Sequence, residues 1–506
     1  MVSSFCWSCL TRLPTPRPLL SAPATIPRAA TAAASFHTST ARAFPMPTKK
    51  SRSLDSGPKY RQAKSARMKK KKPTDKPRPP PIGERKALRK RIVLSNPNAL
   101  EVEGMQDFDA DTMVDSHLHG NVLGLPVTML DQLRAVQAFK PKQGWSIFRR
   151  PGTVVRRETL EMGRLFDRMS GDGADKGKVV KKILTGPKGS GKTVHMLQAM
   201  AMAFTKKWVV FSVPDAQELT LAHTGYAPLS DEQPDLYVQK DSTAALLSRT
   251  AIANQAVLKD LHVSQNHPAL KTPVKEGTTL EDLTKIGIRD PALAWPVFQA
   301  LWTELSATSP AAGFEKSFKP RPPMLVTVDG LAHWMKNSEY LNMESKPIHA
   351  HDLVFVRHFL SLLKSGSQTP TLPNGGLLLY STSASNKPSL PTFEVALKQL
   401  EARQAGVNPS SAEFPQPKAY SNPDPRVLDI ANVSKPASAK EGPVEVQTLG
   451  GLSREEARGF LEYFARSGLL RERISDEMVS EKWTLAGNGV IGELEKLGKR
   501  LRVAAQ

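Results

Sequence analysis

Short runs rich in apolar residues recur along the chain and alternate with segments of helical periodicity. Each run is five to eight residues long, which is typical of a buried strand in a parallel sheet. The runs cover residues 179–185, 208–213, 324–328, 376–383 and 444–449. Because helical segments separate these strands, the pattern predicts a three-layer α/β fold built on one parallel sheet.

Helices are predicted before, between and after the strands. Apolar residues at helical spacing indicate helices at 130–139 and 193–204, and most of the segment between the second and third strands is also predicted to be helical. Ser453 and Glu456 have the spacing of a capping box, which predicts the start of a further helix. A last helix is expected at 490–501, so the chain should finish in a small helical element.

The turn after the first strand carries the most specific motif of the chain. It reads GPKGSGKT, which fits the P-loop pattern GxxxxGK[ST]. Glycines let successive backbone N–H groups curl round a phosphate, and the following helix adds the positive end of its dipole. Strand, turn and helix come in the required order, so we expect a nucleotide to bind here. The expected contacts are Gly186, Pro187, Lys188, Gly189, Ser190, Gly191, Lys192 and Thr193.

The third strand runs into Asp329, in the arrangement of a Walker B carboxylate. Ligands of open α/β sheets collect at the carboxyl ends of the strands, where an acid can face a metal ion bound to phosphates. We therefore expect Thr193 to ligate Mg²⁺ with Asp329 behind it, and Lys192 to bridge the β- and γ-phosphates. As an alternative, an Asp-Gly pair after a strand is also a common turn.

The fourth strand changes from apolar to hydroxyl residues partway along. In P-loop proteins of the AAA-like division, a strand between the P-loop strand and the Walker B strand places a polar side chain beside the γ-phosphate. The candidates here are Ser381, Thr382, Ser383 and Asn386, of which we assign Ser383 to the binding site. A strand end that simply meets solvent would explain the same residues.

The residues that would support hydrolysis or select a base are missing. AAA-like enzymes usually have a glutamate directly after the Walker B aspartate, whereas this chain has Gly330. The sequence at 386–389 nearly forms a guanine-selective NKxD motif but ends in Ser389, and a DxxG motif fails at Ala332. We therefore predict slow or absent hydrolysis, and these residues leave the choice between guanine and adenine open.

The positive charge of the chain is concentrated at its start. Residues 1–91 carry 22 Lys and Arg against 3 Asp and Glu, whereas the remainder carries 48 basic and 45 acidic side chains. Residues 1–48 contain arginine but no acid and are rich in serine, threonine and alanine, which is typical of a mitochondrial transit peptide. Residues 49–91 are basic and contain several prolines, which predicts a disordered tail that neutralises nucleic-acid phosphates. A solvated linker is the alternative for this tail.

Other features narrow the possible chemistry. The two cysteines, Cys6 and Cys9, lie in the predicted leader, so cleavage would leave no thiol in the working protein. No run of 18 or more apolar residues occurs, and no membrane contact is therefore expected. Four arginines within residues 149–157 could face RNA or ligand phosphates, although an exposed helix face explains them almost as well.

These patterns divide the chain into five segments. They are a transit peptide (1–48), a basic rRNA-binding tail (49–91), a lead-in segment (92–168), a P-loop nucleotide-binding domain with a long helical insertion (169–449) and a C-terminal helical element (450–506). Residues 405–442 are rich in Pro, Ser and Lys and are expected to form a long surface loop.

Four segments together resemble the death-associated protein three family. They read PKQGWSIFRRP at 141–151, GPKGSGKT at 186–193, WVVFSVPDA at 208–216 and MLVTVDGLAHW at 324–334. The resemblance implies an AAA-like P-loop domain in the small subunit of the mitochondrial ribosome, near the large subunit, in the mitochondrial matrix. It also implies GTP or GDP with Mg²⁺ as cofactors, and mitochondrial small-subunit rRNA and other mitoribosomal proteins as partners.

Two functional hypotheses follow. In the first, the chain is a structural ribosomal protein that contacts rRNA and holds its nucleotide as a fixed cofactor. In the second, it is an active mitochondrial P-loop NTPase, with GTP or ATP as substrate, that remodels RNA or protein. A remodelling enzyme needs a catalytic acid and usually an arginine finger from a neighbouring subunit, so Gly330 favours the first hypothesis.

Overall fold

The computed structural model describes most of the chain after its basic start. It covers residues 92–499 apart from a few internal positions. Those positions are 172, 174, 271–274, 276, 316–317, 365–371, 384–387, 419, 421 and 431–440. The predicted transit peptide, the basic tail and the candidate Asn386 therefore lie outside the described residues.

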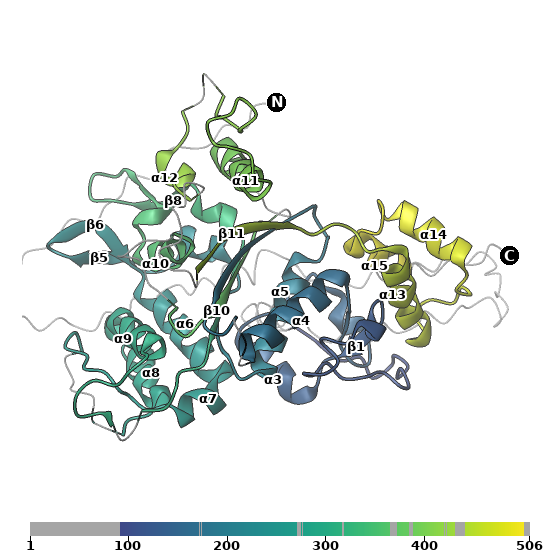
Figure 1. Cartoon of the computed structure of the whole chain (residues 1–506), viewed down its shortest axis with the longest axis horizontal. Coiled ribbons are helices and arrows are strands. Elements are labelled where there is room, and N and C mark those ends of the chain that lie inside the picture. Colours follow the sequence, from purple (N-terminus) through teal and green to yellow (C-terminus); the bar gives the residue numbers. More distant parts are fainter. Residues whose placement is uncertain are drawn as a thin grey trace, which may run out of the picture. The chain divides into compact units, whose positions relative to one another are not determined.

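A five-stranded parallel sheet forms the centre of this part of the chain (Figure 1). Its strands are β3 (Val179–Thr185), β4 (Val209–Val213), β7 (Met324–Asp329), β10 (Gly376–Ser381) and β11 (Glu441–Thr448). Their order in the sheet is β11-β3-β10-β7-β4, and every pairing is parallel. The predicted parallel sheet is confirmed, and β10 lies between β3, which precedes the predicted P-loop, and β7, which carries Asp329.

Alternate residues of β3, β4, β7 and β10 enter two different cores on opposite faces of the sheet. In β10, Leu377 and Leu379 belong to one buried cluster, whereas Leu378 and Tyr380 belong to the other. The first cluster is covered by α3 (Val127–Ala135), α4 (Arg157–Ser170) and α5 (Lys192–Thr205). The second is covered by α6 (Lys240–Ala253), α7 (Gln255–Asp260), α8 (Leu280–Arg289), α9 (Ala294–Ser306), α10 (Val354–Leu363), α11 (Pro391–Gln404) and α12 (Pro425–Leu428). Both faces are covered, which confirms the three layers.

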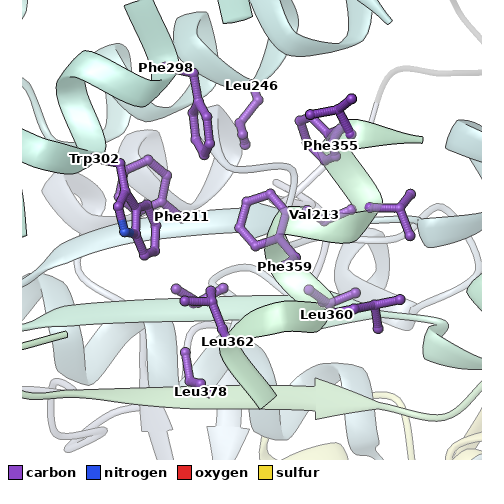
Figure 2. Close-up of a cluster of buried hydrophobic side chains, with 14 of the residues drawn as sticks. Phe211, Val213, Leu246, Phe298, Trp302, Phe355, Phe359, Leu360, Leu362 and Leu378 are labelled. Carbon is purple, nitrogen blue, oxygen red and sulfur yellow. The ribbon is translucent and has the colours of Figure 1, made fainter. Parts of the chain in front are cut away.

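Aromatic side chains fill the second core between the sheet and its helices (Figure 2). The ring centre of Phe211 in β4 lies 5.4 Å from that of Trp302 and 6.1 Å from that of Phe298, both in α9. His358 of α10 joins this cluster, with its ring centre 4.6 Å from that of Trp302. Burial lowers the pKa of His358 from 6.5 to about 3, so its imidazole is neutral in the folded protein.

A side chain closes the free edge of the sheet at β4. The amide oxygen of Asn254, just after α6, accepts a hydrogen bond from the N–H of Val210 at 2.8 Å. Its amide nitrogen donates to the carbonyl of Val210 at 2.9 Å. Asn254 therefore occupies the hydrogen-bonding positions of a further strand, which prevents edge-to-edge pairing at this point.

The C-terminal helices form a smaller core of their own. They are α13 (Arg454–Arg466), α14 (Asp476–Leu485) and α15 (Ile491–Lys499). Phe148 of the lead-in segment belongs to the same core, with its ring centre 4.5 Å from that of Tyr463 and 4.9 Å from that of Phe464. The lead-in segment and the C-terminal element therefore pack together although they lie at opposite ends of the described chain.

Three antiparallel strand pairs were not predicted. They are β1 (Val122–Gly124) with β2 (Gly152–Val154), β5 (Ala227–Ser230) with β6 (Gln233–Val238), and β8 (Asn337–Leu341) with β9 (Pro347–His349). The expectation of helical structure between the second and third strands is therefore wrong at β5 and β6. These strands are short, partly exposed and joined by Asp231 and Glu232, so they lack the apolar runs by which strands are identified.

Several predicted boundaries differ from the structure. The helix expected at 130–139 is α3, which ends at Ala135 because Gln137 adopts a left-handed φ of 55°. The capping box of α13 is confirmed, since Ser453 accepts from the N–H of Glu456 and Glu456 accepts from the N–H of Ser453. The expected loop at 405–442 contains α12 and the start of β11.

Replacing His358 with phenylalanine should make the protein less sensitive to acid. Between the folded pKa of about 3 and the unfolded value of 6.5, the unfolded chain binds a proton that the folded chain does not, so stability falls as the pH drops below 6.5. This loss reaches about 2 kcal/mol at pH 5 for one such group. Urea unfolding at pH 7 and pH 5, followed by tryptophan fluorescence, measures it. An equal loss of stability in the variant and the unmodified protein would contradict this account.

Candidate functional site

The predicted P-loop joins β3 to α5 and contains three glycines in the left-handed region. Their φ angles are 131° at Gly186, 82° at Gly189 and 94° at Gly191. Residues with a Cβ are strained at such angles, so glycine is the residue that suits each position. Gly191 is the N-cap of α5, and Lys192 is its first residue. The first N–H groups of a helix have no partner inside the helix, which makes this end of α5 suited to an anion.

The first glycine of the loop lies too close to its surroundings to carry a side chain. A Cβ atom on Gly186 would lie 2.2 Å from the carbonyl oxygen of Leu449, the residue after β11. A Cβ on Gly189 would lie 3.3 Å from Cγ1 of Val490. The exposed members of the loop are Pro187, Lys188 and Gly189. This geometry fits a loop whose backbone, rather than its side chains, faces a ligand.

The side chain of Lys192 lies along its own loop. Its ammonium donates to the carbonyl of Gly186 at 2.8 Å and to that of Pro187 at 2.9 Å. Burial lowers the pKa of Lys192, while the charge of Asp329 acts in the opposite direction. The ammonium is therefore held at the loop by two neutral carbonyl groups.

Oxygen atoms from three elements meet at Asp329, the last residue of β7. Thr193, in the first turn of α5, donates its hydroxyl to Oδ2 of Asp329 at 3.1 Å. Ser381, the last residue of β10, donates to Oδ1 at 2.6 Å and is the register partner of Asp329 in the sheet. Hydroxyl and carboxylate oxygens are the ligands that hard cations such as Mg²⁺ prefer, so this donor set fits the predicted metal.

Ser381, rather than Ser383, is the residue of the fourth strand that reaches Asp329. Thr382 donates instead to the carbonyl of Leu184 at 3.2 Å, and Ser383 lies half-buried two residues beyond the end of β10. The sequence shows a run of hydroxyl residues but does not show where the strand ends. The binding role assigned to Ser383 stays a prediction.

Arg156 supports the loop, and the sequence did not distinguish it from its neighbours. Its guanidinium is buried and donates to the carbonyl of Ser190 at 2.8 Å and to that of Gly450 at 3.2 Å. The adjacent Arg157 is exposed and pairs with Glu161, one turn further along α4. The alternative of an exposed helix face is therefore right for Arg157 and wrong for Arg156. Nothing in the spacing of the four arginines shows which one is buried.

The C-terminal element also contacts the loop. The N–H of Gly492, in the first turn of α15, donates to the carbonyl of Gly189 at 3.0 Å. Together with Arg156, this contact binds two successive carbonyls of the loop, those of Gly189 and Ser190, from segments at opposite ends of the described chain. Such long-range backbone contacts leave no signal in the local sequence.

Lys140 brings a second ammonium group to the site. Its Nζ donates to the carbonyl of Pro214, directly after β4, and lies 3.9 Å from Oδ2 of Asp329. The only sequence signal near it is the segment 141–151, which carries part of the family resemblance and begins at the next residue. Lys140 is not among the residues that the sequence motifs predict for the site.

The residue after Asp329 has a backbone that favours glycine. Gly330 adopts a φ of 92° as the N-cap of a short 3₁₀ helix at Leu331–Trp334. Its N–H donates to the carbonyl of Ser381 at 3.0 Å, which fixes it against β10. A Cβ here would lie 3.4 Å from the ring of His333. This distance is ordinary van der Waals contact, so the strain of a glutamate at this position would come from its backbone.

Two groups of residues are absent from the part of the chain that the structure describes. None of the described residues forms a group of three or more His, Cys, Asp or Glu side chains able to hold a metal ion. None of the described helices is long and apolar enough to cross a membrane. A Mg²⁺ ion at Thr193 and Asp329 would need phosphate oxygens and water to complete its coordination, which is usual for this ion at nucleotide sites.

Comparison with known proteins gives a match over most of the chain. The family model described as "Mitochondrial ribosomal death-associated protein 3" matches residues 153–497. The chain is also 40% identical over 431 residues to the small ribosomal subunit protein mS29 of Neurospora crassa, and the alignment covers 85% of each chain. The range of the family model includes the predicted P-loop and Asp329 but begins after Lys140.

Replacing Arg156 with methionine should destabilise the protein, since the carbonyls of Ser190 and Gly450 and the acid Glu158 would lose a buried charged partner. Losing one member of a buried charged network costs about 3 kcal/mol. The matched control is Arg157→Met, which removes an exposed ion pair and should change stability little. Urea unfolding measures both, and hydrogen exchange of the loop should rise for Arg156→Met alone. Equal effects of the two substitutions would show that Arg156 has no special role.

Proposed function

The chain belongs to the mitochondrial ribosomal death-associated protein 3 family, and from this membership we propose that it is a structural component of the small subunit of the mitochondrial ribosome. The family is mitochondrial, so the chain works in the mitochondrial matrix. The Neurospora crassa relative carries the name of a small-subunit protein, and the alignment with it covers most of both chains. These two matches support a role within the ribosome.

We further propose that the P-loop binds a guanine nucleotide together with Mg²⁺. The backbone N–H groups from Gly189 to Thr193 would hold the α- and β-phosphates, and Lys192 would exchange its loop carbonyls for the β- and γ-phosphates. Thr193 and Asp329 would hold the metal ion, whose charge offsets that of the phosphates. The observation that carries this proposal is the loop itself, with three glycines at positive φ directly before a helix that begins at Lys192.

Two further features support this assignment. The position of β10 between β3 and β7 is the one expected for a P-loop protein of the AAA-like division, and it brings Ser381 to Asp329. Gly186 also lacks space for a side chain, and the positive φ angles of all three loop glycines suit a residue without a Cβ. Guanine is proposed from the family resemblance alone. The described residues contain no base-specific motif that would distinguish GTP or GDP from ATP.

We propose that hydrolysis is slow or absent, and that the nucleotide acts as a fixed cofactor. The residue after Asp329 is a glycine whose φ of 92° disfavours a glutamate, the residue that usually orients the attacking water. A nucleotide that stays bound would stabilise the protein by about 2.7 kcal/mol at 100 times its dissociation constant. It would do so by joining the P-loop, α5 and the end of β7.

The proposed partners are mitochondrial small-subunit rRNA and other mitoribosomal proteins, with contacts to the large subunit. The basic tail at 49–91 is the proposed rRNA contact, since it carries 18 Lys and Arg and would neutralise phosphates without reading sequence. The near-neutral remainder of the chain favours protein neighbours over a second extended RNA contact.

Small subunits purified with this protein should contain one guanine nucleotide and Mg²⁺ for each copy of the chain. Lys192→Ala removes the ammonium at the loop and should abolish the bound nucleotide, whereas Lys142→Ala, which removes an exposed lysine outside the loop, should retain it. Mass spectrometry of the nucleotide released from the particles reads the result. An empty site in the unmodified particle would overturn the proposed binding, and an adenine nucleotide would overturn the choice of base.

The isolated chain should hydrolyse GTP far more slowly than about one turnover per second, the lower end of typical enzyme rates. Gly330→Glu should not raise this rate, because the left-handed backbone holds the new carboxylate at a strained position, and it should lower the melting temperature. Phosphate release with GTP and Mg²⁺ measures turnover. A fast rate that disappears in Lys192→Ala would instead support the NTPase hypothesis.

A further inference from the structure

We propose that Lys140 is a further ligand-contacting residue, which recognises the terminal phosphate of a nucleoside triphosphate and makes the site prefer triphosphate to diphosphate. This inference rests on the proposed nucleotide binding and deepens it. Lys140 lies outside the P-loop and the Walker B strand, and outside the range matched by the family model. Three observations carry the proposed role: the position of the ammonium group, the hydrogen bonds that fix the backbone of Lys140, and the charges around Asp329.

Lys140 approaches the site from the carboxyl edge of the sheet. Its ammonium donates to the carbonyl of Pro214 at the end of β4 and lies 3.9 Å from Oδ2 of Asp329 at the end of β7. The same Oδ2 accepts the hydroxyl of Thr193, the predicted metal ligand. The ammonium of Lys140 therefore lies beside the carboxylate of Asp329, where the proposed metal ion and phosphates would also lie. The segment that carries Lys140 precedes the sheet in the sequence.

The turn that carries Lys140 is fixed by its neighbours. The side-chain oxygen of Gln143 accepts from the N–H of Lys140 at 2.8 Å and from the indole N–H of Trp145 at 2.6 Å. The N–H of Gln143 donates to the carbonyl of Lys140 at 3.1 Å. Trp145 packs edge-on against Phe139, with 5.3 Å between ring centres, and both rings are buried. The backbone of Lys140 is thus held in place, while its flexible side chain reaches toward Asp329.

The charges at Asp329 indicate what this side chain can do. Oδ1 of Asp329 accepts from Ser381 and Oδ2 accepts from Thr193, and both donors are neutral hydroxyl groups. The positive charge paired with this carboxylate is the ammonium of Lys140. A divalent cation at these oxygens would repel the ammonium, because both carry positive charge and compete for Oδ2. The four-carbon side chain can then turn toward another anion.

A terminal phosphate is the anion that would attract the displaced ammonium. Lys192 is assigned to the β- and γ-phosphates from the P-loop side, whereas Lys140 would approach from the opposite side, that of β4 and β7. A diphosphate lacks this group, so Lys140 would contribute to the affinity for a triphosphate and little to that for a diphosphate. A cation supplied by the same chain would thus favour binding of the triphosphate, while Gly330 leaves hydrolysis slow.

The test compares the affinity of the full chain for two nucleotides in the presence of Mg²⁺. The probes are GDP and a non-hydrolysable GTP analogue with a β,γ-imido bridge, and equilibrium dissociation constants are measured for the unmodified protein, Lys140→Met and Lys140→Arg. The matched control is Lys142→Met, an exposed lysine two residues away. Melting temperatures of all variants without nucleotide show whether a substitution damages the fold.

Lys140→Met should weaken binding of the triphosphate analogue about ten- to hundred-fold, the usual range for a lost charge-assisted hydrogen bond. Its affinity for GDP should change by less than about three-fold, within the usual scatter for such contacts. Lys140→Arg should keep most of the preference for triphosphate, and Lys142→Met should behave as the unmodified protein.

An unchanged ratio of the two affinities in Lys140→Met overturns the inference. A parallel loss of both affinities together with a lower melting temperature also overturns it, because a structural role alone would have that effect. If the unmodified protein binds neither nucleotide, the proposed function fails and this inference fails with it. That outcome differs from the first two, in which the unmodified protein binds both nucleotides.

Discussion

The carboxylate of Asp329 is the point at which the parts of the site are joined. Its two oxygens accept hydrogen bonds from Thr193 and Ser381, and the ammonium of Lys140 lies close to one of them. These side chains come from α5, β10 and the lead-in segment, so four separate stretches of the chain share one charge. The sheet makes this possible, because parallel strands end at the same edge and β7 and β10 pair with Asp329 opposite Ser381. A shift of one residue in that register would turn Ser381 to the other face and separate the two.

The predicted P-loop depends on contacts from other segments of the chain to hold its conformation. Glycines lose more conformational freedom on folding than other residues, and three of them here adopt positive φ angles. Arg156 and Gly492 offset part of this cost by binding the carbonyls of Ser190 and Gly189. The lead-in segment and the C-terminal helices are therefore parts of the site, although neither contains a recognised nucleotide motif.

The sequence predicts the elements of this fold better than it predicts their contacts. The central strands and the helix after the glycine loop are rich in apolar residues, so β3, α5 and Asp329 at the end of β7 could be predicted from local pattern. The hairpin of β5 and β6 could not, because its strands are short and exposed. Among the hydroxyl residues of the fourth strand, the choice between Ser381 and Ser383 depends on where β10 ends, which the composition does not show. The burial of Arg156 and the approach of Lys140 to Asp329 depend on contacts between distant segments. Such contacts leave no local pattern in a single sequence.

The order of the strands has a consequence for how the protein matures. The N-terminus of a polypeptide emerges first, whether from the ribosome that makes it or through a membrane pore. In this chain, however, the late strand β11 pairs with β3, and Gly492 binds the loop that follows β3. While the last part of the chain is still in transit, β3 lacks one neighbour and the glycine loop lacks one of its two supports. The contacts around the loop can therefore be completed only after α15 is released, and a chain truncated before α15 would lack the contact between Gly492 and Gly189.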